Sequence, residues 1–420
     1  MRPSTDASEP SPMAVDLDTV FQPVVEVGTR TVVGFEALTR APSGIWTSAA
    51  GLFHAAERQN LVVEFDWRCR VTSLRAALAA AFPTDMMLFL NAEPTGLDAA
   101  PPADALPLLG AARGLSITVE ITERHLMRDP AGLLRAVEHA RRLGWRIALD
   151  DVGADSSSLA LLELLRPDVI KLDMSLVQDR MPAAAAAAIR SAVTTEADRT
   201  GAVIVAEGIE NERHERHAIE LGAHHGQGYL YGHPTRLPTF GPTDEAAGTT
   251  ATATPPAVTV RDPAAVTPWG LSRHVDGRRR IDEAGLLEAE RRLVNRATQL
   301  GATAMVFVTV PASTTISAEH RTRLRDAAAH TALTAVFHAS PVVEGDAYRH
   351  VTVDPYEPLA RERSVIVVSP TYAAASIALE IGLSDDGFAI YESVLTEDRE
   401  AALGAATLLT RRIPALDPAD

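Results

Sequence analysis

Short apolar runs alternate with Ala- and Leu-rich segments between Thr19 and about Thr239. The runs are apolar at consecutive positions, as expected for parallel strands covered by helices on both faces. They are Met87–Leu90, Ser116–Val119, Arg146–Leu149, Asp168–Lys171 and Ala202–Val205. Segments between them, such as Pro130–Leu143 and Ala183–Arg199, have helical composition. This alternation predicts an α/β fold, either a barrel or a doubly wound sheet.

A second alternating region follows a change in composition. Residues 1–18 are rich in Pro, Ser and acids and are expected to be a disordered tail, and residues 241–260 read as a flexible linker of small residues and prolines. Beyond the linker, we expect strands at Ala304–Val310, Ala335–His338, Ser364–Val368 and Gly387–Tyr391, and helices at Ile281–Leu300, Ser317–His330, Tyr372–Gly382 and Glu397–Arg412. The sequence therefore predicts one α/β domain at 19–240 and a smaller one at 261–420.

Composition narrows the class of protein. The formal charge of −16 argues against direct binding of a nucleic-acid polymer, which needs a basic surface. The single cysteine, Cys69, excludes a disulfide framework and favours a reducing compartment. The N-terminus has no signal-peptide pattern, and no apolar run is long enough to span a bilayer. We therefore expect a cytoplasmic protein that does not enter membranes.

Polar residues stand at the ends of the apolar runs. Most are acids, and the set comprises Glu36, Asn91, Glu120, Asp150, Asp151, Lys171, Asp173, Glu207 and Gln227. The carboxyl ends of the strands in a parallel barrel gather on one face, where active sites are built. Carboxylates this close to one another need countercharge, and oxygen ligands suit Mg²⁺, Mn²⁺ or Ca²⁺. The adjacent pair Asp150-Asp151 is suited to bridging two metals that cleave a phosphodiester bond.

These residues also occur in an ordered series of motifs. The series is Phe21-Gln22-Pro23-Val24, Glu36-Ala37-Leu38-Thr39-Arg40, Leu90-Asn91, Val119-Glu120-Ile121-Thr122-Glu123, Leu149-Asp150-Asp151, Lys171-Leu172-Asp173, Glu207-Gly208-Ile209-Glu210, and Gln227-Gly228-Tyr229-Leu230 with Pro234. Each motif is common alone, but their order along Thr19–Pro234 resembles the EAL domain, the cyclic di-GMP phosphodiesterase module of bacterial signalling.

The resemblance implies a modified (β/α)8, TIM-like barrel that opens cyclic di-GMP to linear pGpG with two divalent metals, Mg²⁺ or Mn²⁺. It implies that one metal is bound by Glu36, Asn91, Glu120 and Asp150, and that Asp151 and Glu207 lie beside a second ion. Lys171 would act on the attacking water, and Asp151 and Glu207 are expected to be catalytic with it. The implied substrate contacts are Gln22, Leu38, Arg40, Gln227 and Pro234, and Glu123 would anchor the loop after Asp151. Through that loop the family couples metal binding to dimerisation, so a homodimer is expected.

The loop after Asp151 departs from the family's pattern. Val152 stands in place of an aromatic residue, and Asp155 in place of a glycine. Loss of glycine's backbone freedom predicts poor order in residues 152–156, with lower activity or altered regulation. The rival hypothesis is a receptor that binds cyclic di-GMP without cleaving it, and a third is a purely structural interaction module, which leaves the strand-end acids unexplained.

Residues 262–416 resemble a DICT domain, a sensory module of bacterial signalling proteins. The resemblance rests on Ala304–Val310, Tyr348–Val351, Pro358–Val365, Tyr372–Leu379 and Leu395–Arg399. It implies a regulatory domain with a ligand that the sequence leaves unknown. Histidines 330, 338 and 350 are scattered and indicate no metal site.

Overall fold

The structure is a computed structural model that describes residues 11–41, 49–121, 128–155, 158–240, 267–339, 347–383 and 389–416. The predicted linker at 241–260 and the predicted loop anchor Glu123 lie outside these residues. Among the helices so described, none has both the length and the apolar character that crossing a membrane requires.

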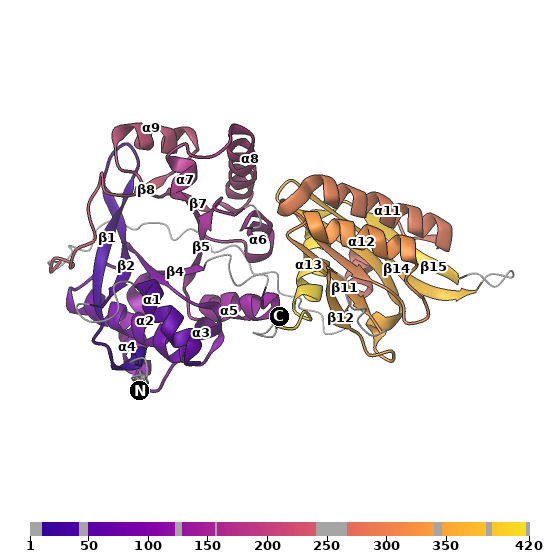
Figure 1. Ribbon diagram of the computed structural model, residues 1–420, viewed down its shortest axis with the longest axis horizontal. Coiled ribbons are helices and arrows are strands. Elements are labelled where there is room, and N and C mark those ends of the chain that lie inside the picture. The colour runs from indigo at the N-terminus through magenta and orange to yellow at the C-terminus, as the bar shows by residue number, and fades with distance from the viewer. Residues whose placement is uncertain are drawn as a thin grey trace, which may run out of the picture. The chain divides into compact units, whose positions relative to one another are not determined.

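Eight strands close into a barrel in the order of the chain. They are β1 (Asp18–Glu26), β2 (Val32–Arg40), β3 (Met87–Asn91), β4 (Ser116–Ile121), β5 (Arg146–Val152), β6 (Val169–Leu172), β7 (Val203–Ala206) and β8 (His225–Gln227). β1 runs antiparallel to both β2 and β8, whereas β2–β3, β3–β4 and β7–β8 are parallel pairs. Figure 1 shows β1 and β2 as a long twisted ribbon. The predicted barrel, modified at its first strand, is confirmed.

The barrel's helices alternate with its strands. They are α1 (Ala49–Arg58), α2 (Val62–Ala79), α3 (Pro94–Asp98), α4 (Leu106–Ala111), α5 (Pro130–Arg142), α6 (Ser158–Leu165), α7 (Met174–Val177), α8 (Ala183–Thr200) and α9 (Glu212–Glu220). α5 and α8 match the predicted helices within one residue at each end. α8 ends where Gly201 adopts a left-handed backbone with φ of 78°, a common helix stop.

Residues 11–18 depart from the predicted disordered tail. Pro12–Ala14 form a 3-10 helix, and the Arg68 side chain on α2 donates hydrogen bonds to the carbonyls of Pro12, Met13 and Val15. Met13 and Val15 also pack against the buried Leu52 cluster. A guanidinium with three backbone acceptors fixes this segment, an interaction between distant residues that local composition does not reveal.

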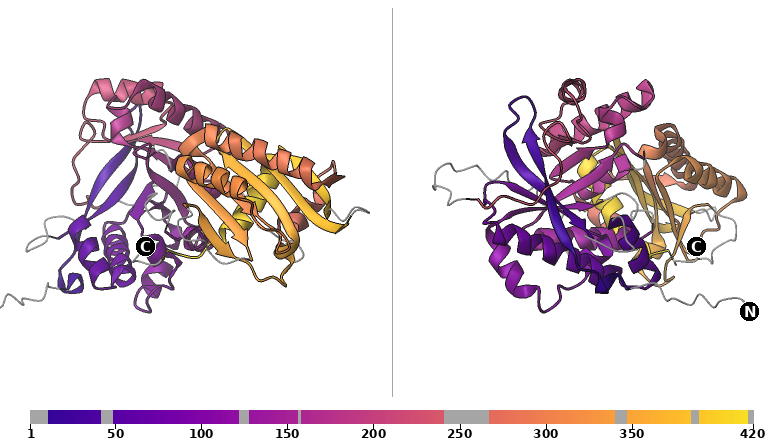
Figure 2. Two further views of the ribbon diagram at one scale, coloured as in Figure 1. Left: turned by 45° about the vertical axis from the view of Figure 1, so that its right-hand side comes forward. Right: turned by 60° about the vertical axis from the view of Figure 1, so that its left-hand side comes forward.

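A seven-stranded sheet forms the C-terminal region, in the order β12-β11-β10-β13-β14-β15-β9. Its elements are α10 (Pro268–Leu271), β9 (Arg279–Asp282), α11 (Glu283–Leu300), β10 (Met305–Thr309), α12 (Ala318–His330), β11 (Leu333–His338), β12 (Arg349–Thr352), β13 (Glu362–Ser369), β14 (Tyr372–Leu383), β15 (Ala389–Thr396) and α13 (Arg399–Thr410). All eight residues of β13 are buried, as expected for a central strand covered on both faces. Figures 1 and 2 show α11 and α12 side by side over one face of the sheet.

The predicted helix at Tyr372–Gly382 is wrong, because this segment is the strand β14. Its run of alanines has helical propensity, yet β14 pairs antiparallel with β13 on one side and β15 on the other. Pairing on both sides satisfies the backbone of β14, and small side chains such as Ala374 let α11 and α13 pack closely on it. Tertiary packing here overrides the propensity of alanine.

Contacts among the described residues define two compact units. One is drawn from 1–121, 135–148 and 205–253, and the other from 122–134, 149–204 and 254–420. The second unit therefore holds the barrel segment from β5 to β7 together with the C-terminal sheet.

Candidate metal and phosphodiester site

Gln22, Glu36 and Gln227 meet on three neighbouring strands. Gln22 on β1 lies opposite Glu36 on β2, and Gln227 ends β8, which pairs with β1 on its other side. The Gln227 amide donates to Gln22 Oε1 at 3.1 Å and to Glu36 Oε2 at 2.5 Å. All three side chains are buried. The antiparallel register of β1 thus joins a predicted metal ligand to two predicted substrate contacts.

Asn91 and Glu120 extend this group along the parallel strands. Asn91 is the last residue of β3 and lies beside Glu120 on β4. Its amide donates to Glu36 Oε1 at 3.0 Å, so both Glu36 oxygens accept hydrogen bonds from amides. Glu120 is 1% exposed. Three of the predicted ligands therefore lie on adjacent strands. Asn91 is the last residue of β3 and Glu120 the last but one of β4, whereas Glu36, expected at a strand end, lies in the middle of β2.

Asp150 and Lys171 form an ion pair at the ends of β5 and β6. Lys171 Nζ lies 2.9 Å from Asp150 Oδ1, and Lys171 is 1% exposed. The next residue, Asp151, has a left-handed backbone with φ of 52°. Among residues with a side chain, aspartate is one that tolerates this conformation, and such backbones concentrate at functional sites.

Asp150, Asp151 and Glu207 form a carboxylate cluster. Each offers one oxygen, and these oxygens lie within 4.8 Å of one another. Asp150 is buried, and the other two are half-buried. Three oxygen donors at this separation suit a hard divalent cation. The Lys171 charge balances one carboxylate of the three, so the donor set fits a divalent metal.

Gly228 is a residue that the chemical reasoning missed. A Cβ built on it would lie 2.1 Å from the carbonyl oxygen of Ile209, so no other residue fits there. The Ile209 amide donates to the Gln227 carbonyl at 3.0 Å, and the Leu230 amide donates to the Ile209 carbonyl at 3.0 Å. This close approach fixes the segment after Glu207 against the end of β8. The signal in the sequence was the glycine directly after Gln227.

The remaining predicted substrate residues lie around the strand ends. Leu38 is half-buried on β2, and Arg40 is exposed at its last residue, where its guanidinium donates to the Thr39 carbonyl at 3.0 Å. Pro234 is half-buried and follows the Gly232–His233 step. The Gly232 carbonyl accepts from the Gln22 amide at 3.2 Å, which ties the segment before Pro234 to the Gln22 network.

The loop after Asp151 is built differently from the expectation. Val152 is buried and forms a bridge with Asp155, and the left-handed glycine of the loop is Gly153, with φ of 105°. Asp155 does not adopt a left-handed backbone, so the missing glycine causes no strain at that position. Ser158 Oγ accepts from the Gly153 amide at 3.3 Å and donates to the Asp155 carbonyl at 2.6 Å. Residue 156 lies outside the described part of the chain.

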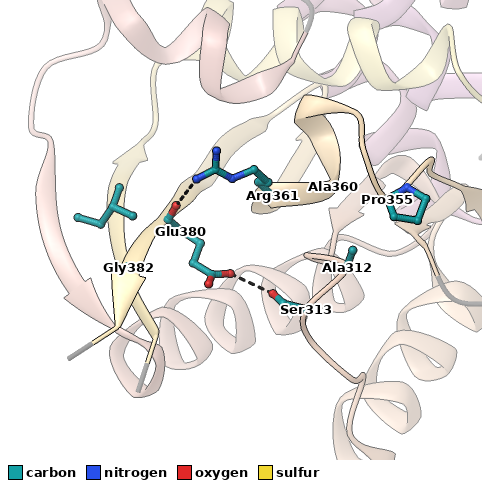
Figure 3. Close-up of a pocket in the computed structure, with 8 residues that line it drawn as sticks. Ala312, Ser313, Pro355, Ala360, Arg361, Glu380 and Gly382 are labelled. Atoms are coloured by element: carbon teal, nitrogen blue, oxygen red, sulfur yellow. Dashed lines mark hydrogen bonds between the residues drawn. The ribbon is translucent and has the colours of Figure 1, made fainter. Parts of the chain in front are cut away.

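The C-terminal region carries an open pocket of about 370 Å³. Figure 3 shows that Arg361 and Ser313 both point to Glu380. Arg361 donates to the Glu380 carbonyl at 3.3 Å, and Ser313 donates to the Glu380 carboxylate at 3.0 Å. Because these polar groups bind one another, the pocket identifies no ligand class.

Comparison with known proteins places this site in a family. Residues 13–234, more than half of the 420-residue chain, match the EAL domain. "Probable cyclic di-GMP phosphodiesterase PdeI" of Escherichia coli (strain K12) is 30% identical over 229 residues, 52% of this chain and 29% of that protein. "Cyclic di-GMP phosphodiesterase RocR" of Pseudomonas aeruginosa is 29% identical over 225 residues, 52% of this chain and 57% of that protein.

Among solved structures, the manganese/cyclic di-GMP complex of BlrP1 from Klebsiella pneumoniae is 28% identical with a TM-score of 0.46, covering 56% of this chain and 58% of that chain. The matched region spans less than two thirds of each of these three proteins. The family match itself runs from before β1 to beyond β8 and includes every strand-end acid described above. This chain belongs to the EAL-domain family.

Proposed function

We propose that this protein hydrolyses cyclic di-GMP to linear pGpG with divalent metal ions. The observation that carries the proposal is the carboxylate cluster Asp150, Asp151 and Glu207, whose oxygens lie within 4.8 Å of one another beside the buried Lys171. The names of PdeI and RocR, relatives at about 30% identity, support cyclic di-GMP as the substrate.

The balanced reaction adds one water to one phosphodiester. The water oxygen forms a bond to phosphorus, the bond between phosphorus and the 3′ oxygen breaks, and the 3′ oxygen takes up a proton. Bound divalent cations would lower the pKa of the water and stabilise charge on the phosphoryl oxygens. Asp150, Asp151 and Glu207 would hold one cation, and Glu36, Asn91, Glu120 and Asp150 the other. Mg²⁺ and Mn²⁺ are the proposed ions.

Lys171 is proposed to act on the attacking water. Its ammonium lies 2.9 Å from Asp150 and is almost fully buried, so its charge is weakly screened by solvent. We assign Lys171 the orientation of the attacking water. The Gln227 amide donates hydrogen bonds to Gln22 and Glu36. Both glutamines are proposed to contact the nucleotide, together with Leu38, Arg40 and Pro234. Arg40, with an exposed guanidinium at the end of β2, is suited to a phosphate.

The C-terminal region is proposed to be a sensory and regulatory domain, and the active species a homodimer. Its DICT-like motifs support the sensory role, and the covalent link to the barrel supports regulation. Sedimentation or light scattering of the full chain with and without Mn²⁺ tests the dimer. A monomer under both conditions contradicts it.

The activity is tested by incubating the full chain with cyclic di-GMP and either Mg²⁺ or Mn²⁺ and separating the nucleotides by chromatography. Wild type is expected to release pGpG, and Glu36→Ala to lose about a thousandfold or more of the rate, because a lost ligand removes the stabilisation of transition-state charge. The matched control is Arg291→Ala, which removes an exposed ion pair with Glu288 on α11. Nucleotide binding without linear product favours the receptor hypothesis, and no binding contradicts both.

A further inference from the structure

α6 is buried on every side although it is a barrel helix. All eight of its residues, Ser158–Leu165, are buried, and its sequence Ser-Leu-Ala-Leu-Leu-Glu-Leu-Leu is apolar around the whole helix. A helix on a protein surface keeps a polar face, so an all-round apolar helix must be covered. Within its compact unit, α6 contacts β13, α13 and the 3-10 turn Gly301–Thr303 of the C-terminal region.

Charged residues from α6, α8 and α13 meet at this contact. Arg399, the first residue of α13, places its guanidinium 2.9 Å from Glu163 on α6, and it also donates to the Ser369 carbonyl of β13 at 3.0 Å. Arg199 on α8 lies 3.6 Å from Glu163 and 2.5 Å from Glu196. The side chains of both glutamates are fully buried. The pKa of Glu163 is raised to about 7, mainly by burial and secondly by the neighbouring Glu196 carboxyl.

Two further contacts join the same elements. Arg166, at the end of α6, lies 2.5 Å from Glu400 on α13. The Leu416 amide, after α13, donates to the Arg128 carbonyl ahead of α5 at 2.7 Å. The C-terminal region thus supplies both a cation to the buried acids and an anion to Arg166, which is the charge complementarity of a specific interface.

The covered helix begins at the candidate metal loop. Ser158 is the first residue of α6, and its hydroxyl accepts a hydrogen bond from the Gly153 amide and donates one to the Asp155 carbonyl. Gly153 and Asp155 follow Asp151 by two and four residues. The same loop also contacts α8. A Cβ built on Gly153 would lie 3.2 Å from Cδ1 of Ile189, so the Ile189 side chain fills the space beside this glycine. The Val152 carbonyl accepts from the Asp173 amide at 3.1 Å, two residues after Lys171. Displacement of α6 or α8 therefore moves the backbone that carries Asp150 and Asp151.

We propose that docking of α13 on α6 through the Arg399–Glu163 ion pair orders the Asp150–Asp155 loop and thereby sets the affinity of the site for divalent cations. The C-terminal region then controls the barrel by its attachment to one helix, and a signal that releases α13 lowers the affinity for metal. This inference rests on the proposed metal site, and Arg399 acts as a positioning residue. It contacts Glu163 and the Ser369 carbonyl, and not the proposed reacting atoms.

The test compares Arg399→Ala with Arg323→Ala in the full chain. Arg323 on α12 is half-buried, pairs with the exposed Glu319 in the same region, and is the matched control. Mn²⁺ affinity is measured by electron paramagnetic resonance, and hydrogen exchange is followed in peptides from residues 150–165. Arg399→Ala is expected to weaken Mn²⁺ binding about three- to tenfold and to speed exchange in these peptides. Arg323→Ala is expected to match wild type.

A second variant approaches the pair from α6 and guards against unfolding of the C-terminal sheet. Glu163→Gln is expected to weaken Mn²⁺ binding as well, and the double variant Glu163→Gln/Arg399→Ala to lose less than the sum of the two losses. Wild-type Mn²⁺ affinity in Arg399→Ala, or additive losses, would overturn the proposal. Neither Mn²⁺ affinity nor hydrogen exchange requires the protein to cleave a substrate. A protein that binds Mn²⁺ as expected but cleaves no cyclic di-GMP therefore refutes the proposed function and leaves this inference standing.

Discussion

Buried charge is arranged in two different ways in the barrel and in the C-terminal sheet. Glu36, Glu120 and Asp150 are buried acids of the barrel, and the buried Lys171 pairs with Asp150. In the C-terminal region, Arg363 binds Glu290 through two hydrogen bonds of 2.7 and 3.1 Å, and both side chains are buried. Among these residues the first arrangement has more buried acids than buried cations, whereas in the second the two charges are of opposite sign and bind each other. The two groups therefore differ in their balance of buried charge.

The largest expected effect is on the complete pair. Glu290→Ala leaves the Arg363 guanidinium buried without its main partner and is expected to lower the free energy of unfolding by about 3–5 kcal/mol. Urea unfolding in the presence of a chelator measures this change. Glu36→Gln under the same conditions is expected to change it by less than about 1 kcal/mol, because relief of like-charge repulsion offsets the weaker hydrogen bonds. An equally large loss in Glu36→Gln would show that the barrel acids are structural.

A smaller effect is expected at Glu362, a buried acid on β13. Burial raises the pKa of Glu362 to about 7, against hydrogen bonds from Thr267 and the Trp269 amide. The fold thus favours the protonated carboxyl, so this group's contribution to stability is complete below about pH 4.5 and is lost as pH rises through 7. Glu362→Gln mimics the protonated form and is expected to raise stability by about 2–3 kcal/mol at pH 8 and little at pH 5. Equal changes at both pH values in urea unfolding contradict this prediction.

The smallest effect is expected in the metal loop. Asp155→Gly restores the glycine of the family's pattern, but the backbone of Asp155 is not left-handed. The change is therefore expected to lower stability by about 0.5–1 kcal/mol through chain entropy and to leave Mn²⁺ affinity unchanged. A several-fold gain in affinity would show that Asp155 itself weakens the site. Thermal unfolding and Mn²⁺ titration measure the two quantities.

The sequence predicted the barrel because its strands depend on local patterns. β3 to β7 are short apolar runs, and the acids that end them need only the rule that parallel strands share one carboxyl face. The orientation of β1 and the hydrogen bonds of Gln22 with Gln227 depend on pairing between distant segments. The family resemblance predicted that these residues act together, but their contacts required the structure.

The errors have the same physical origin. β14 was predicted as a helix because alanine propensity is local, while its pairing with β13 and β15 is not. Residues 11–18 were predicted to be disordered because the three backbone hydrogen bonds from Arg68 join segments about fifty residues apart. An eight-residue helix at Ser158–Leu165 that is apolar except for Ser158 and Glu163 indicates a covering partner.

The barrel's first strand and the segment after its last strand are hydrogen-bonded to each other. The Phe21 amide donates to the Thr235 carbonyl at 2.6 Å, and the Thr235 amide donates to the Phe21 carbonyl at 3.0 Å. The barrel therefore begins and ends at neighbouring positions. Such a module can be inserted into a loop of another protein, or joined to a partner at either end, without stretching either chain. Evolution and protein engineering can thus exchange its neighbours while the strand-end acids stay in position.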